Sequence, residues 1–285
     1  MTFRNTKRNG FLLMAISLAW LFVLPANAQR LATMNHQPWL GFFSGYVQRG
    51  FDFAVGDEGQ CYLFLKTNKG ERVGKDRTIK IYAEVILEMP NGERVVKRLK
   101  RDEGLSSELE PSLKHKEVTF LAESTGGAQV EINIQYSRKK IILDGKILNR
   151  GTLKSGKLIL CHRVVVPAMY SDTYQDNEKK QKSRMRSDKI KFVRAVDKRR
   201  VTLKSYEAVN LMDEKMAQGG ITDLTVKMDG QEGKDFNFTT TGGRDVLLFT
   251  NKSPETKGKL WQGYHVIWQR ALGDKKMSPL EIEVK

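Results

Sequence analysis

The chain has 285 residues, 40% of them hydrophobic and 29% charged, and 49 Lys and Arg against 33 Asp and Glu give it a formal net charge of +16. This length is enough for one large domain or two ordinary ones. The positive excess favours anionic partners, such as acidic polysaccharides or cell-envelope polymers. No apolar run after residue 28 approaches the ~18 residues of a membrane-spanning helix, so we expect no transmembrane anchor there.

Residues 1–28 have the layout of an export signal. Basic residues occupy the start, an apolar run covers 11–24, and Ala26 and Ala28 provide the small side chains that a signal peptidase reads. The apolar run is shorter than the ~20 residues that a spanning helix needs. We therefore expect cleavage between Ala28 and Gln29 and a periplasmic or extracellular protein.

Short strands separated by turn residues recur along the rest of the chain. The clearest strand is 79–89, where apolar residues alternate with mostly polar ones, as on a strand with one buried face. Asn91-Gly92 is typical of a tight turn, so 94–99 is predicted to return as the partner strand. The same pattern predicts three further hairpins: 118–122 with 130–136, 140–143 with 146–148 about Asp144-Gly145, and 237–240 with 246–250. The fold is therefore predicted to be mostly β, an antiparallel β-sandwich.

The periodic pattern lapses over 170–189, which we predict to be a polar and basic linker or a long loop. It would separate a β-sandwich-like domain over 29–169 from a second β domain over 190–285, with one large sandwich as the alternative. One short helix is predicted over 205–218, because Ser205 can cap its start and Gly219-Gly220 can end it.

The two cysteines, Cys61 and Cys161, both lie in apolar, strand-like surroundings. Export would place them in an oxidising compartment, where they could form a disulfide. Two separate buried thiols are the alternative, because the sequence does not show whether the two Cα atoms come within ~7 Å.

Common catalytic signatures are missing from the sequence, including the Gly-x-Ser-x-Gly elbow, the phosphate-binding loop and the His-Glu-x-x-His motif. Glu84 and Glu88 share one face of a strand, but their Cα atoms would lie ~13 Å apart, which is too far for a glycosidase pair. We expect both to be solvent-facing charges. The histidines and cysteines have no metal-ligand spacing, so no metal or cofactor is predicted.

Two groups of residues are candidates for ligand binding. The segment 179–204 is densely basic, and exposed aromatic residues on a strand could pack against sugar rings. The alternatives are a solvated linker for the basic segment and core packing for the aromatic residues. The candidate ligand-binding residues are Lys182, Arg184, Arg186, Lys189, Lys191, Trp261, Tyr264 and Trp268.

The sequence favours an exported, non-catalytic binding protein for an anionic glycan or cell-envelope polymer. Only Phe192 interrupts the basic segment with an aromatic ring, which argues against a surface for single-stranded nucleic acid. The alternatives are an extracellular polysaccharide-degrading hydrolase or lyase on a sandwich scaffold and a structural component of the envelope.

Overall fold

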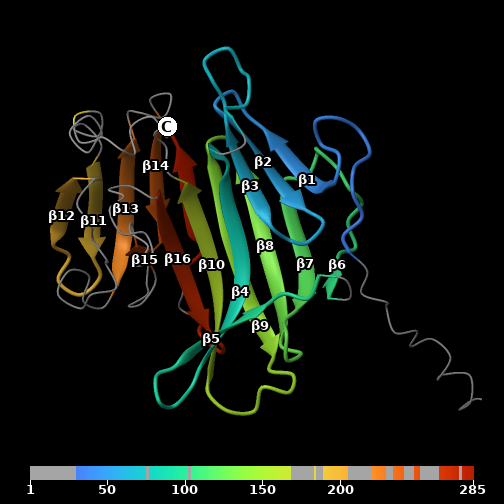
Figure 1. Ribbon diagram of the computed structural model, residues 1–285, viewed down its shortest axis with the longest axis vertical. Coiled ribbons are helices and arrows are strands. Elements are labelled where there is room, and N and C mark those ends of the chain that lie inside the picture. Colours follow the sequence, from blue (N-terminus) through green and yellow to red (C-terminus); the bar gives the residue numbers. More distant parts are fainter. Residues whose placement is uncertain are drawn as a thin grey trace, which may run out of the picture.

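The computed structural model describes residues 30–74, 77–101, 104–167, 183, 189–204, 220–228, 234–240, 247–250, 263–275 and 278–285. Strands dominate these residues, and they form two antiparallel sheets packed together, which confirms the predicted β-sandwich (Figure 1). No helix among the described residues is long and apolar enough to cross a bilayer.

The first sheet, sheet I, is built on the long neighbouring strands β4 (Ile79–Glu88) and β10 (Lys157–Pro167). Strands β3 (Cys61–Leu65) and β5 (Arg94–Arg98) pair with the same edge of β4 at different points along its length. In spatial order the sheet runs β1 (Phe42–Val47), β2 (Phe51–Gly56), β3 (Cys61–Leu65), β4 (Ile79–Glu88) with β5 (Arg94–Arg98), β10 (Lys157–Pro167), β16 (Gly263–Ala271) and β15 (Leu247–Thr250).

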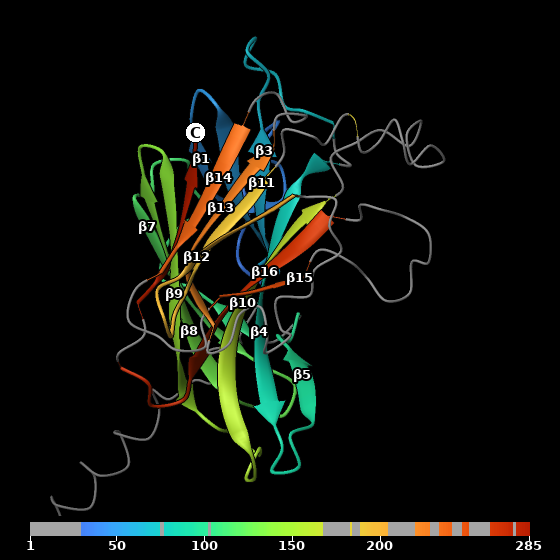
Figure 2. The same ribbon diagram turned by 90° about the vertical axis from the view of Figure 1, so that its left-hand side faces the viewer.

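The second sheet, sheet II, packs on one face of sheet I, and Figure 2 shows β7 to β9 on the opposite side of the molecule from β4 and β5. The Ile221–Leu247 pair and the Leu99–Ser124 bridge join the two sheets. Sheet II runs β6 (Leu105–Ser106), β7 (Glu117–Glu123), β8 (Gln129–Ser137), β9 (Lys140–Asn149), β17 (Leu280–Val284), β14 (Lys234–Thr239), β13 (Ile221–Met228), β11 (Lys189–Arg194) and β12 (Arg200–Lys204).

The main hydrophobic core lies between the two sheets. In β7 and β8 every second residue is buried and the residues between them are mostly exposed or half-buried, because one face of an antiparallel sheet meets the core and the other meets water. The central strand β10 differs, with Leu158 to His162 buried on both faces. A small outer cluster of Ile86, Ile159 and Cys161 covers its second face.

Two of the four predicted hairpins are confirmed. The first is β4 with β5, and the second is β7 with β8. In both, the turn residues that the sequence displays coincide with the observed chain reversal.

The predicted hairpin about Asp144-Gly145 is wrong, because 140–149 is one continuous strand, β9. A Cβ added to Gly145 would lie 2.6 Å from the carbonyl oxygen of Glu131 and 2.7 Å from a methyl carbon of Leu160. The glycine therefore permits close packing inside a strand, a role that sequence alone does not separate from a turn. Asp144 is held by an ion pair with Arg270 at 2.5 Å.

The predicted hairpin between 237–240 and 246–250 is also wrong. Among the described residues, β14 pairs with β13 and β17, whereas β15 pairs with β16 and touches β13 at one position. The two strands follow each other in the chain but belong to different sheets.

The predicted domain boundary separates strands that are hydrogen-bonded neighbours. Strand β10 pairs with β16, and β9 pairs with β17, so both sheets contain strands from the two portions. One hydrophobic core also includes residues from both portions. The predicted helix at 205–218 and nearly all of the predicted linker at 170–189 lie outside the described residues.

Cys61 and Cys161 are both free and buried, so the structure contains the two separate thiols and not the disulfide. Cys61 points into the main core, whereas Cys161 belongs to the outer cluster on the other face of the same sheet. Burial raises the pKa of both thiols well above its ordinary value, which makes them poor nucleophiles.

Candidate functional site

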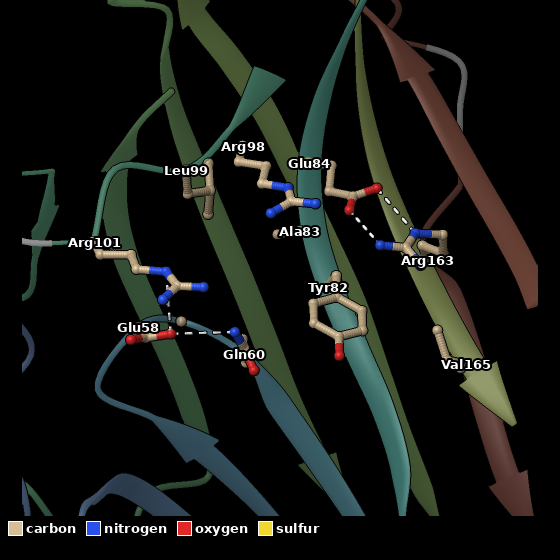
Figure 3. Close-up of a pocket in the computed structure, with 11 residues that line it drawn as sticks. Glu58, Gln60, Tyr82, Ala83, Glu84, Arg98, Leu99, Arg101, Arg163 and Val165 are labelled. Atoms are coloured by element: carbon tan, nitrogen blue, oxygen red, sulfur yellow. Dashed lines mark hydrogen bonds and ion pairs between the residues drawn. The ribbon is translucent and has the colours of Figure 1, made fainter. Parts of the chain in front are cut away.

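A hollow of about 390 Å³ opens on the outer face of sheet I (Figure 3). This volume falls within the ~300–1,000 Å³ that is usual for small-molecule sites. Its walls come from the turn between β2 and β3, from β4 and β10, and from the end of β5. The lining residues are Glu58, Gly59, Gln60, Tyr82, Ala83, Glu84, Arg98, Leu99, Arg101, Arg163 and Val165.

The hollow lies where the edge of β4 changes partner. Along this edge β3 pairs with Ile79 to Ile81, and β5 pairs with Glu84 to Glu88. Tyr82 and Ala83 lie between these two stretches and have no strand partner on that side. The opposite edge of β4 pairs with β10 without interruption from Lys80 to Glu88. The hollow is thus a local break in one ladder of an otherwise continuous sheet.

A buried ion pair forms one wall of the hollow. The Arg163 guanidinium donates two hydrogen bonds to the Glu84 carboxylate, with Nε to Oε2 at 3.0 Å and Nη2 to Oε1 at 2.5 Å. The Glu84 side chain is only 10% exposed and that of Arg163 28%. The bond to Glu84 raises the pKa of Arg163, so this residue stays charged. A two-pronged pair in this sheltered setting fixes both side chains.

The prediction that Glu84 faces solvent is therefore wrong. It points to the outer face of the sheet, as its position on the strand requires, but neighbouring side chains cover it. Glu88, on the same face, is more exposed and pairs with Arg94 at 2.6 Å.

Tyr82 lies beside the ion pair, and the Arg163 guanidinium lies 4.8 Å from the centre of its ring. A cation at this distance is attracted to the electron-rich face of the ring. On the other side of Tyr82, a polar chain runs along the turn between β2 and β3. Tyr62 donates to Gln60 at 2.8 Å, and Gln60 donates to Glu58 at 3.2 Å.

Arg98 lines the hollow from the end of β5. Its Cα lies opposite that of Glu84 across the β4–β5 pair, and Figure 3 shows its side chain reaching from β5 over β4 toward Ala83. The Glu84 carboxylate is already held by Arg163. Among the described residues, the Arg98 guanidinium has no ion-pair or hydrogen-bond partner, whereas Arg101 lies 3.6 Å from Glu58. With three arginines against two glutamates, the lining carries a net positive charge.

His265 of β16 stands next to this group, because its Cα pairs with that of Val165. Burial lowers the pKa of His265, and the nearby Arg163 lowers it further, while Glu84 opposes the shift. The imidazole is therefore neutral at pH 7 and adds no charge to the hollow.

A Ser–His contact elsewhere in the fold does not form a nucleophilic site. His115 Nδ1 lies 2.9 Å from Ser44 Oγ, which also lies 3.1 Å from the Tyr136 hydroxyl. Ser44 is completely buried, so a substrate cannot reach its hydroxyl. The buried Ser44 and Tyr136 and the half-buried His115 thus form a polar network within the fold.

A second charged cluster on the outer face of sheet I is also structural. Asp52 is 5% exposed, and its carboxylate forms ion pairs with Lys66 Nζ at 2.5 Å and with Arg72 Nε at 2.8 Å. The Arg72 guanidinium lies 4.7 Å from the Trp39 ring centre and 4.2 Å from that of Phe64. Trp39 is 4% exposed, so this part of the amino-terminal aromatic group packs in the fold.

The residues proposed from the sequence lie away from the hollow or outside the described residues. Trp268 is completely buried and donates from Nε1 to the Ser278 carbonyl oxygen at 2.9 Å, so its predicted role as a surface contact is wrong. Lys189 and Lys191 are exposed on β11 of sheet II. Tyr264 lies on β16, and its side chain is not among those described. Lys182, Arg184, Arg186 and Trp261 lie outside the described residues.

Sequence reasoning missed Tyr82, Arg98 and Arg163 as site residues and set Glu84 aside. The pair that organises the site joins residues 79 positions apart, and neither belongs to a motif. The one available signal was that Tyr82, Glu84 and Ile86 occupy the outward face of a strand whose other face is apolar. Among the described residues, no cluster of His, Cys, Asp and Glu has the arrangement of a metal site.

No protein-family model matches this sequence, and no curated protein matches it either. Among solved structures, one that is similar is the crystal structure of an Escherichia coli K12 protein described as a "Putative aldose 1-epimerase". The two share 10% identity with a TM-score of 0.44, over 85% of this chain and 98% of that one. A likeness this distant carries no argument about what this chain does.

Proposed function

We propose that the protein binds an acidic saccharide, one bearing carboxylate or sulfate groups, in the hollow on the outer face of sheet I. The observation that carries the proposal is the Arg98 guanidinium, which lies over the hollow beside the Glu84–Arg163 pair and has no partner in the part of the chain that the structure describes. A free guanidinium with its planar fork of donors matches an anionic oxygen pair.

The surroundings of Arg98 strengthen this reading. The half-buried Tyr82 offers ring surface against which a sugar can pack, and the polar chain of Gln60 and Glu58 offers hydrogen-bond partners for hydroxyl groups. The proposed export of the chain would bring it to envelope or extracellular polymers.

The ligand remains an anionic glycan, as the sequence favoured, but the binding site lies in the hollow of sheet I instead of the basic segment. The basic segment 179–204 is no longer needed to supply the binding charge. Of its candidate residues, Lys189 and Lys191 are exposed on β11 of the other sheet, where long flexible side chains would have to be ordered to hold a ligand.

The test is isothermal titration of the purified protein with polygalacturonate, dextran sulfate and uncharged dextran. We expect at least one acidic polymer to bind and dextran not to bind. Arg98→Gln should weaken that binding at least tenfold, because it removes the free charge. Arg94→Gln is the matched control: this residue projects from the same face of β5 but does not line the hollow, and its loss should leave binding unchanged.

Equal binding by the Arg98→Gln variant and the unmodified protein would place the ligand elsewhere and overturn the proposal. The same incubations are analysed for new reducing or unsaturated sugar ends. Their appearance, and their loss in Glu84→Gln, would show that the hollow is an active site and not only a binding site.

A further inference from the structure

Lys80 is an exposed cation on the outer face of sheet I, on the other side of Tyr82 from Arg98. Successive residues of β4 alternate between the two faces of the sheet, so Lys80, Tyr82 and Glu84 share the outer face. Lys80 is exposed, whereas Tyr82 is half-buried. The Cα of Arg98 lies opposite that of Glu84 across the β4–β5 pair. Along the strand, the ring of Tyr82 therefore separates the two cations.

The strand neighbours of Lys80 are uncharged. Its Cα pairs with that of Tyr62 on β3 and with that of Val165 on β10. Val165 lines the hollow, and Tyr62 donates to Gln60, which lines it as well. Among the described residues, the side chains of Lys80 and Arg98 have no ion-pair or hydrogen-bond partner. Lys80 thus stands at the rim of the hollow with its charge available to a ligand.

The two cations lie too far apart for a single sugar acid. Lys80 and Glu84 are four residues apart on one strand, which places their Cα atoms ~13 Å apart at ~3.3 Å per residue. A similar distance separates the Cα atoms of Lys80 and Arg98, because Arg98 lies opposite Glu84. A monosaccharide with one acidic group can pair with only one of them. A chain of sugar acids can place an acidic group at each cation and a ring against Tyr82 between them.

The opposite direction along the face is less suited to an anionic chain. Beyond Arg98 the outer face leads to Glu88, whose half-exposed carboxylate pairs with Arg94 at 2.6 Å. Lys157 is exposed at the start of β10, and its Cα pairs with that of Glu88. An acidic chain that reached Lys157 would pass this carboxylate, and like charges repel. Lys80 is therefore the better second contact, and Lys157 is a matched control.

We propose that Lys80 is a second anion-binding position, and that the ligand is a linear acidic oligosaccharide that spans Arg98, Tyr82 and Lys80. One acidic group pairs with Arg98, a sugar ring lies against Tyr82, and a later acidic group pairs with Lys80. An ammonium group on a flexible stem is a point charge, so this contact tolerates variation in the spacing of the acidic groups. This inference rests on the proposed function and narrows it to oligomers that carry more than one charge.

The experiment is isothermal titration of the purified protein with two monomer–tetramer pairs: galacturonate with tetragalacturonate, and glucose 6-sulfate with maltotetraose sulfate. The unmodified protein should bind the tetramer at least tenfold more tightly than the monomer in at least one pair. Lys80→Gln should weaken binding of that tetramer about fivefold, because the lost ion pair is exposed to water, and should leave the monomer unchanged. Lys80→Arg should retain the affinity, and Lys157→Gln should leave both ligands unchanged.

Three results would overturn the role of Lys80 while anion binding at Arg98 stands. The first is that neither tetramer binds more tightly than its monomer, and the second is that Lys80→Gln affects monomer and tetramer equally. The third is that Lys157→Gln weakens tetramer binding as much as Lys80→Gln does. If Arg98→Gln leaves the binding of every probe unchanged, the proposed function fails as well.

Discussion

The outer faces of the two sheets carry charge in different ways. On sheet II, exposed ion pairs such as Lys140 with Glu281 and Lys146 with Glu131, each at 2.8 Å, extend across neighbouring strands. On sheet I, the Glu84–Arg163 pair is sheltered, and Arg98 beside it has no partner among the described residues. Arg98 is exposed at the hollow and has no partner among the described residues, so it is available to an anion. The arrangement of charge, and not its density along the sequence, distinguishes the two faces.

The difference follows from strand pairing. In sheet II, β8 pairs with β7 and with β9 along most of its length, with a register shift only at the Gln129–Val130 end of the β8–β9 pair. Sheet I is interrupted on one edge of β4, where β3 ends before β5 begins. That interruption creates the hollow in which the arginines and Tyr82 collect.

The sharpest contrast is between the two kinds of ion pair. Arg163→Met should lower the free energy of unfolding by about 3–4 kcal/mol, because it leaves the buried Glu84 carboxylate without its partner. Lys140→Met removes half of an exposed pair and should change stability little. Urea unfolding of both variants measures this. A similar loss in the two would show that the sheltered pair is no different from a surface pair.

One polar contact between the two sheets, made by His162, should make stability depend on pH. His162 of β10 donates from Nε2 to the Asp144 carbonyl oxygen of β9 at 3.0 Å, and burial lowers its pKa from 6.5 to about 4. The folded state therefore favours the neutral imidazole. This contribution is complete above pH 6.5 and is lost as the pH falls toward 4, by about 3 kcal/mol at ~1.4 kcal/mol per pKa unit.

The measurement is urea unfolding of the unmodified protein and of His162→Gln at pH 7 and pH 4. Other groups titrate in both proteins, so the informative quantity is the difference between their pH dependences. Parallel curves would mean that His162 is not the buried neutral group that joins the sheets.

Gly145→Ala tests how closely the two sheets approach. The added methyl group would meet the Glu131 carbonyl oxygen and Leu160 at less than 3 Å, so we expect a loss of about 2 kcal/mol in unfolding free energy. Lys146→Ala, one residue along the same strand and facing solvent, is the control and should cost far less. Equal stability of Gly145→Ala and the unmodified protein would contradict the close packing.

The smallest effect should come from the basic strand of sheet II. The double variant Lys189→Gln with Lys191→Gln should change affinity for the acidic polymer less than about threefold, through the loss of long-range attraction alone. Titration at two salt concentrations checks this, because that residual effect should vanish at high salt. A loss as large as that of Arg98→Gln would return the binding site to the basic segment.

The strand patterns of this protein were predictable because burial on one face imposes a period of two. The hairpins of β4 with β5 and of β7 with β8 follow from that period and from local turn residues. The same reasoning failed at Gly145, where a glycine inside a strand has the local signature of a turn. It failed again at β14 and β15, because neighbours in the chain need not be neighbours in a sheet.

The site was not predictable in the same way. Tyr82 and Glu84 could be assigned to the outward face of a strand, but their partners could not, because Arg163 reaches them from a strand far along the chain. Trp268 had the sequence features of a surface aromatic residue and is instead buried against His162, at 5.1 Å between ring centres. Which face of a strand is covered depends on what packs over it.

The amino-acid sequence alone determined the fold class, several of the strands and the positive charge, since these depend on local periodicity, turn chemistry and composition. Only the tertiary structure decided the order of strands in the sheets, the separation of the two thiols and the place where a cation is left without a partner. Those features depend on contacts between segments distant in the chain, and a single sequence does not encode such contacts in any local pattern.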